Sequence, residues 1–130
     1  MGKLFALLLL VAVLLGCEKT QTPIVHRVVT GVEVEYYRAG ERIERSYCQT
    51  ENVESVLTYL RILRPFGPTV PEGEFDSGCQ ITLHYNQGPD SVYRQIGNKY
   101  LSRDGGDWQN INDANANLLY PLLLLLPSDG

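Results

Sequence analysis

The sequence predicts an α+β domain, with an antiparallel sheet of about five strands in the order ββαβββα, helices packed on one face, and one disulfide. The prediction rests on the spacing of apolar residues along the chain and on the composition of the stretches that separate the apolar segments. Apolar residues alternate with polar ones where strands are expected, and they recur every three or four residues where a helix is expected. Stretches rich in Gly and Pro separate these segments, so consecutive elements are expected to fold back on one another.

The first two strands are expected at residues 28–37 and 42–48. Along the first of them the two faces carry different side chains: Val32, Val34 and Tyr36 on one, and Glu33, Glu35 and Tyr37 on the other. Ala39 and Gly40 then supply a turn, because glycine takes a positive φ at no steric cost. The two strands are therefore expected to form a hairpin with one buried and one solvated face.

A helix is expected next, with Thr50 as its N-terminal cap. Its apolar positions step by three and four residues and form one continuous face: Val53, Val56, Leu57, Leu60 and Leu63. Pro65 ends the helix, since proline cannot continue it, and residues 65–73 are expected to form a long loop.

Three further strands are expected to form a meander at residues 80–85, 91–96 and 99–102. Gly88-Pro89-Asp90 provides the first turn, and Gly97-Asn98 provides a two-residue connection of the kind favoured in tight hairpins. The stretch Asp104-Gly105-Gly106-Asp107 then ends the last strand.

A second helical segment is expected in the leucine-rich tail, residues 110–126, packed across the sheet. Pro121 either kinks this helix or starts a second short one. The leucines outnumber the positions that one amphipathic face requires. Contact of the tail with a partner or with a lipid surface therefore stays open as an alternative to core packing.

The first residues have the pattern of an export signal. Lys3 precedes an apolar run at residues 4–15, which is shorter than the roughly 20 residues that a membrane-spanning helix needs. The run ends in Leu14-Leu15-Gly16-Cys17, which resembles the lipobox of bacterial lipoproteins. The resemblance implies cleavage after Gly16, a lipid on Cys17, and export.

On this resemblance the chain divides into a signal peptide at 1–16, a lipidated tether at 17–24 and a small α+β domain at 25–130. The membrane is then a partner, through the lipid on Cys17, on the exported side of the cell envelope. The size and layout of the domain are similar to those of many small lipoproteins, without the signature of a specific family. A plain secretory signal with an incidental Cys17 is the alternative, but an A-x-A-like cleavage site is missing.

Two cysteines remain once Cys17 carries a lipid. In an exported chain, Cys48 and Cys79 are expected to form a disulfide, which closes a loop of about 31 residues and contributes roughly 3–4 kcal/mol in the loop-entropy model. A redox pair would favour the C-x-x-C spacing that is absent here, and a metal site would need more ligands.

Composition and charge exclude several classes of function. The formal net charge is −4, and every acidic residue follows Cys17. Binding to nucleic acid depends on Lys and Arg at the phosphates, so no nucleic-acid partner is expected. No cofactor and no metal are expected either, because the oxygen-rich stretch at residues 104–113 lacks the spacing of a calcium loop and suits turns and helix caps.

No catalytic residues are expected. The chain has two histidines, His26 and His84, and neither lies in a hydrolase motif. The paired carboxylates Glu33 and Glu35 fall on the solvent-facing side of a strand, where they stay ionised and cannot act as a general acid.

By elimination, the sequence favours a non-catalytic binding or protein-interaction module held at the membrane, with an envelope protein as partner. Tyr37 with Glu33 and Glu35 is the candidate binding surface, because exposed aromatic side chains can anchor an interface. Binding of a glycan or a small ligand is the alternative, and an envelope hydrolase is a third. An interaction module needs an exposed apolar or aromatic patch, and a glycan or ligand receptor needs a concave aromatic groove. A hydrolase needs a carboxyl group with a raised pKa in a cleft.

Overall fold

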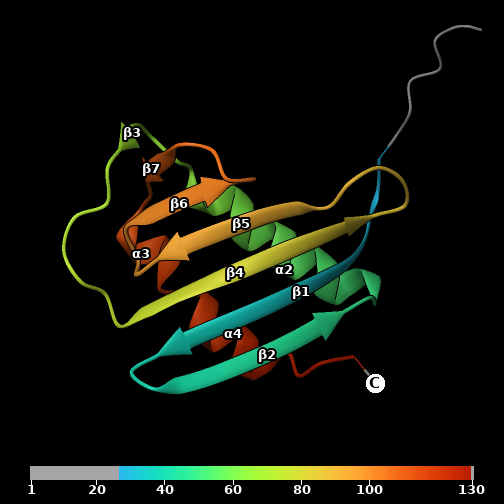
Figure 1. Ribbon diagram of the computed structural model, residues 1–130. Helices are drawn as coiled ribbons and strands as arrows, with labels where there is room; N and C mark the ends of the chain where they lie inside the picture. Colours follow the sequence, from blue (N-terminus) through green and yellow to red (C-terminus); the bar gives the residue numbers. More distant parts are fainter. Residues whose placement is uncertain (1–26, 130) are drawn as a thin grey trace, which may run out of the picture.

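The computed structural model describes residues 27–129, which form one antiparallel sheet with helices on one of its faces (Figure 1). The α+β class predicted from the sequence is confirmed. The expected signal peptide at 1–16 and the lipidated tether at 17–24 lie outside the described residues. Within residues 27–129, no helix is both long enough and apolar enough to cross a membrane.

The sheet has seven strands in the order β2-β1-β4-β5-β6-β7-β3, and all neighbouring strands are antiparallel. The strands are β1 (Val29–Arg38), β2 (Glu41–Tyr47), β3 (Pro68–Thr69), β4 (Ser77–Tyr85), β5 (Ser91–Ile96), β6 (Tyr100–Arg103) and β7 (Trp108–Asn110). The helices are α2 (Thr50–Leu63), α3 (Asp113–Ala116) and α4 (Leu119–Leu125). In Figure 1, α2 and α4 lie behind the same face of the sheet.

The expected count of about five strands is too low, because β3 and β7 are very short. Two and three residues are too few to show an alternation of apolar and polar side chains. Pro68 pairs with Gln109, so the loop after α2 returns to extend the edge of the meander. The predicted hairpin of β1 with β2 is confirmed. Three residues and not two connect β5 to β6, since Ile96 pairs with Tyr100.

The hydrophobic core lies between the helices and one face of the sheet. β1 and β4 supply their alternate residues to it: Val32, Val34, Tyr36, Cys79, Ile81 and Leu83. The helices supply Val53, Val56, Tyr59 and Leu63 from α2, and Leu119 and Leu123 from α4. The other face of the sheet, turned towards the viewer in Figure 1, carries no helix from residues 27–129.

The leucine-rich tail divides between core and surface. It folds as α3, which is capped by the Asn112 side chain, and then as α4. Pro121 is the third residue of α4, in the first turn, where a missing N–H removes no helical hydrogen bond. Leu119 and Leu123 are buried, whereas Leu125 is 75% exposed. The tail thus packs against the core and keeps an apolar outer side.

The predicted disulfide is wrong: the Cys48 and Cys79 thiols are both free. Cys79 of β4 pairs with Tyr36 of β1, whereas Tyr47 of β2, the residue before Cys48, pairs with Val32 of β1. Val32 and Tyr36 lie about 13 Å apart along β1. In addition, β2 and β4 lie on opposite sides of β1, two strand spacings or about 10 Å apart. The α-carbons are therefore more than about 15 Å apart, well beyond the limit of about 7 Å for a disulfide.

Cys79 belongs instead to a small buried polar cluster under α2. The Tyr59 hydroxyl donates to Gln95 Oε1 at 2.6 Å, and the Cys79 Sγ lies 3.9 Å from the same oxygen. The Gln95 amide in turn donates to the Gly97 carbonyl at 2.9 Å. Because water cannot solvate a thiolate at this depth, burial raises the pKa of the Cys79 thiol to about 12.

The two cysteines are expected to react very differently with iodoacetamide at pH 8. Raising the thiol pKa from 9.0 to about 12 leaves Cys79 with a thiolate population about a thousandfold smaller than that of an ordinary thiol, and the side chain is also buried. Mass spectrometry of the native protein should find Cys48 modified and Cys79 intact, and both modified in denaturant. Equal modification of the native protein, or a disulfide-linked peptide pair, would contradict the structure.

The start of α2 is held by the C-terminal end of the chain and not by Thr50, which is the first residue inside the helix. The N-cap residue is Gln49, whose side chain forms no capping hydrogen bond. The Asp129 carboxylate instead accepts hydrogen bonds from the backbone N–H groups of Cys48 and Gln49 and from the Asn52 amide. The hydrogen bond from the Gln49 N–H contributes most to lowering the pKa of this carboxyl.

Replacing Asp129 by alanine is expected to lower the melting temperature at pH 7 by a few degrees. A carboxyl whose folded pKa is lowered stabilises the fold above its ordinary pKa of 3.8, and this contribution disappears as the pH falls through the lower folded value. Calorimetry across pH 2–7 should therefore show a difference between wild type and Asp129→Ala that closes in acid. Asp107→Ala is the control, since Asp107 makes no hydrogen bond or ion pair within residues 27–129. A constant difference across this range would refute the capping role.

Candidate functional site

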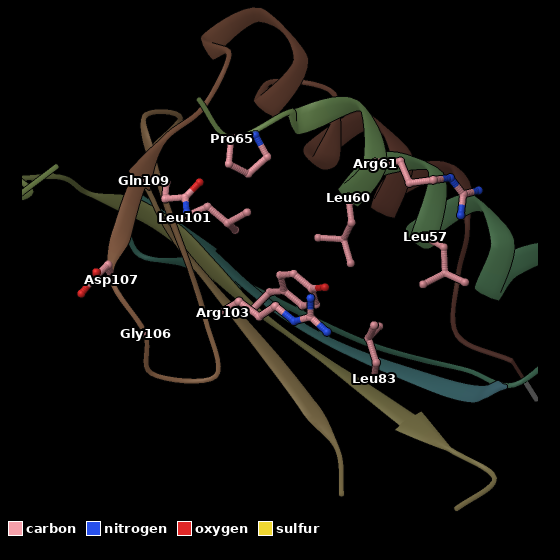
Figure 2. A pocket seen from close by; sticks show the side chains of 11 residues that line it. Leu57, Leu60, Arg61, Pro65, Leu83, Leu101, Arg103, Gly106, Asp107 and Gln109 are labelled. Carbon is pink, nitrogen blue, oxygen red and sulfur yellow. The ribbon is translucent and has the colours of Figure 1, made fainter. Parts of the chain in front are cut away.

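A groove of about 620 Å³ opens between α2 and the strands β4, β5 and β6 (Figure 2). The helix forms one wall and contributes Leu57 and Leu60. The covered face of the sheet forms the other wall and contributes Leu83, Tyr93 and Leu101, one from each strand. Small-molecule sites commonly have volumes of about 300–1,000 Å³ and mainly apolar walls, and this groove has both properties.

The groove exists because α2 does not cover the whole width of the sheet. The buried stripe of α2 consists of Val53, Val56, Tyr59 and Leu63. Leu57 and Leu60 lie to one side of this stripe and are only partly buried. Figure 2 shows both side chains directed from the helix towards the sheet across an open space. The helical period alone indicates one wide apolar face, but only part of that face is fully buried.

Arg103 and Tyr93 bring polar groups into this apolar space. The Arg103 guanidinium carbon lies 5.5 Å from the centre of the Tyr93 ring, within the range of a cation–π contact. Figure 2 shows the guanidinium between the sheet and α2, on the side of Leu57 and Leu83. Burial raises the pKa of the Tyr93 hydroxyl, so this group remains protonated and can donate a hydrogen bond.

Two further charged residues lie at the rim. Arg61 on α2 contacts Thr58 Oγ1 at 3.1 Å and Glu54 at 3.5 Å. Asp107 lines the end near Gln109, and Figure 2 shows its carboxylate pointing away from the apolar walls. The inner groove therefore has a positive guanidinium and no inward carboxylate among the labelled residues.

The uncovered face of the sheet holds the residues that the sequence predicts as a binding surface. Tyr37 is 46% exposed there, as the alternation along β1 indicates. Glu33 and Glu35 share its face, but they have different neighbours. Glu35 pairs with Arg42 at 3.4 Å, whereas Glu33 lies 3.0 Å from His84. The structure therefore brings Tyr37 and Glu35 together around one depression, whereas Glu33 lies outside it.

Tyr37 lies over Gly78, its cross-strand neighbour on β4. A Cβ atom at position 78 would lie 2.7 Å from the Tyr37 hydroxyl oxygen, so only glycine leaves room for the phenol ring here. Trp108 and Arg94 join Tyr37 around a depression of about 330 Å³, roughly half the volume of the groove. This depression is the feature of the structure that a glycan-binding interpretation would use.

His84 links two strands on the uncovered face. Its Nε2 lies 3.0 Å from Glu33 and its Nδ1 lies 3.1 Å from Asp90, so a doubly protonated imidazolium can donate to both carboxylates. Partial burial lowers the pKa of His84, but the hydrogen bonds to Glu33 and Asp90 outweigh it, and the net shift is above 6.5. The cluster lies on the opposite face of the sheet from the groove.

Among residues 27–129, no three His, Cys, Asp or Glu side chains are grouped as metal ligands. No known protein family, curated protein or solved structure matches this chain.

The groove residues Tyr93, Leu101 and Arg103 were not identifiable from the sequence. They look like ordinary alternating strand positions until α2 is placed beside them.

Replacing His84 by glutamine is expected to destabilise the protein in a pH-dependent way. A histidine whose folded pKa is raised stabilises the fold fully below its ordinary pKa of 6.5, and this contribution is lost as the pH rises through the folded value. The melting temperature of His84→Gln should thus fall below that of wild type at pH 5.5 and approach it at pH 9. Glu35→Gln on the same face is the control, because its carboxylate does not contact His84. Should the gap instead widen with pH, the imidazolium interpretation would be wrong.

Proposed function

We propose that this chain is a non-catalytic binding lipoprotein, held by a lipid on Cys17 at the exported side of a bacterial membrane, that takes a small ligand in the groove between α2 and the sheet. The observation that carries the proposal is the groove itself, with apolar side chains from α2, β4, β5 and β6 around an open space of about 620 Å³. This geometry favours the small-ligand alternative over a flat protein interface.

The apolar walls supply the driving force for binding. Each 100 Å² of apolar surface removed from water contributes about 2.5 kcal/mol, before the cost of immobilising the ligand is subtracted. Leu57 and Leu60 are partly buried and supply apolar surface that a ligand can cover. Leu83 and Leu101 belong to the buried core and form a fixed wall opposite them, so little of this free energy is spent on ordering the protein. Only a few polar groups are then needed to orient the ligand.

A non-catalytic role is supported by where the titratable groups lie. The groove is lined by two arginines, a tyrosine and Asp107, but by neither His84 nor either thiol. Its one carboxylate, that of Asp107, points away from the apolar walls in Figure 2. His84 and its carboxylates lie on the other face.

The proposed anchor sets where the ligand would be met. Residues 18–24 reach no more than about 25 Å when extended, so the groove would stay close to the lipid surface. A ligand of the cell envelope is therefore favoured over one in bulk solution.

A protein-interaction module is the second candidate, and the outer side of the tail favours it. Three leucines of this segment are exposed: Leu118, the residue before α4, and Leu124 and Leu125 at its end. Exposed leucines of this kind can anchor an envelope protein, as can Tyr37 on the uncovered face.

Filling the groove is expected to weaken ligand binding. The probe is dodecanol carrying a diazirine, used with the full chain in nanodiscs, and mass spectrometry locates the labelled peptides. Saturable labelling should fall on α2, β5 and β6, and Leu60→Trp should reduce it about tenfold because the larger ring occupies the space between helix and sheet.

Leu125→Trp is the matched control, since it adds the same ring at an exposed leucine outside the groove. Both variants should keep a cooperative thermal transition. Labelling that spares the groove, or that both variants reduce equally, would rule out the groove as the binding site.

A further inference from the structure

We infer that the groove selects a single-chain amphiphile with a carboxylate head, bound by Arg103 and the Tyr93 hydroxyl. The inference rests on the proposed function and adds the chemical class of the ligand. Both residues line the groove, and the Arg103 guanidinium carbon lies 5.5 Å from the centre of the Tyr93 ring.

The Arg103 guanidinium has free donors. Its Nε lies 3.6 Å from Asp104 Oδ2, which is longer than a hydrogen bond. Asp104 is itself held by the backbone, since its Oδ1 accepts from the Val92 N–H at 2.8 Å. Within residues 27–129, no acceptor is found for Nη1 or Nη2 of Arg103. The two terminal nitrogens present the planar fork that binds a carboxylate through two parallel hydrogen bonds.

Tyr93 supplies a second donor beside this fork. Its ring supports the guanidinium at 5.5 Å, and no hydrogen bond to its hydroxyl is found in the described part of the chain. Burial keeps the hydroxyl protonated, as described above. A half-buried donor without a partner gains more from an anionic acceptor than one that already has a protein acceptor.

The surrounding charges favour an anion over a cation. Arg61 adds a second guanidinium at the rim, partly offset by Glu54 at 3.5 Å. Asp104 lies beside Arg103, and Asp107 directs its carboxylate away from the apolar walls in Figure 2. A cationic head would meet Arg103 directly, whereas a carboxylate would be attracted to it.

The apolar walls define the rest of the ligand. Leu57 and Leu60 face Leu83 and Leu101 across the groove, so an acyl chain can lie between α2 and the sheet while its head contacts Arg103 (Figure 2). The Arg103 side chain is 61% exposed, so water screens part of its attraction. A preference of about tenfold for the acid over the alcohol is therefore expected.

The test compares unlabelled dodecanoate and dodecanol as competitors of the diazirine probe, with the full chain in nanodiscs of neutral lipid. The measured quantity is the ratio of the dodecanoate and dodecanol concentrations that give half-maximal competition. Arg103→Gln should raise this ratio about tenfold relative to wild type, because the attraction of the guanidinium for the carboxylate is lost. Arg94→Gln is the matched control, because Arg94 lies on the opposite face of β5, paired with Gln80. Partition of each competitor into lipid is the same for all variants, so it cancels when the ratio for one variant is divided by the ratio for another.

The outcomes separate the two levels of the proposal. The same ratio in Arg103→Gln as in wild type would overturn the carboxylate preference and leave the apolar groove as a binding site. Equal loss of the preference in Arg94→Gln and Arg103→Gln would likewise overturn the role of Arg103 in selecting the carboxylate. Absence of saturable labelling in the groove would overturn the proposed function together with this inference.

Discussion

The pairing of β1 with β4 is the constraint on which the rest of this structure depends. Its register places Val32, Val34 and Tyr36 beside Leu83, Ile81 and Cys79 on the face that the helices cover. A shift by one residue would turn the glutamates of β1 into the core and its valines towards solvent, at a large cost in buried charge. The register is therefore strongly fixed by the hydrophobic effect.

The same register explains the features of both faces. It sets Cys79 far from the end of β2, so Cys48 cannot reach it, and it encloses the Cys79 thiol beside Gln95. On the uncovered face it brings Tyr37 over Gly78 and Glu33 close to His84. Separate observations on thiols, aromatic packing and charge thus share a single physical origin.

The groove follows from a mismatch of widths. A single helix about 10 Å across cannot cover a sheet whose strands lie about 4.8 Å apart once the sheet exceeds a few strands. α2 reaches across the sheet as far as β5, where Tyr59 donates a hydrogen bond to Gln95, but Leu57 and Leu60 on one side of the helix are only partly buried. These two leucines line the strip beside the helix, where Arg103 and Tyr93 add polarity. A ligand in this strip would complete the burial that the helices leave unfinished.

The sequence by itself determined the local elements: the alternation in β1 and β4, the three-four period of α2 and its end before Pro65, and the turn at Gly40. These are set by interactions within a few residues, so they can be read in order along the chain. Tertiary structure alone decided the state of the cysteines, the capping of α2 by Asp129, the pairing of β3 with β7, and the groove that joins α2 to Arg103. Each of these depends on which distant segments become neighbours, and the strand order that fixes those neighbours is chosen by the packing of the whole core.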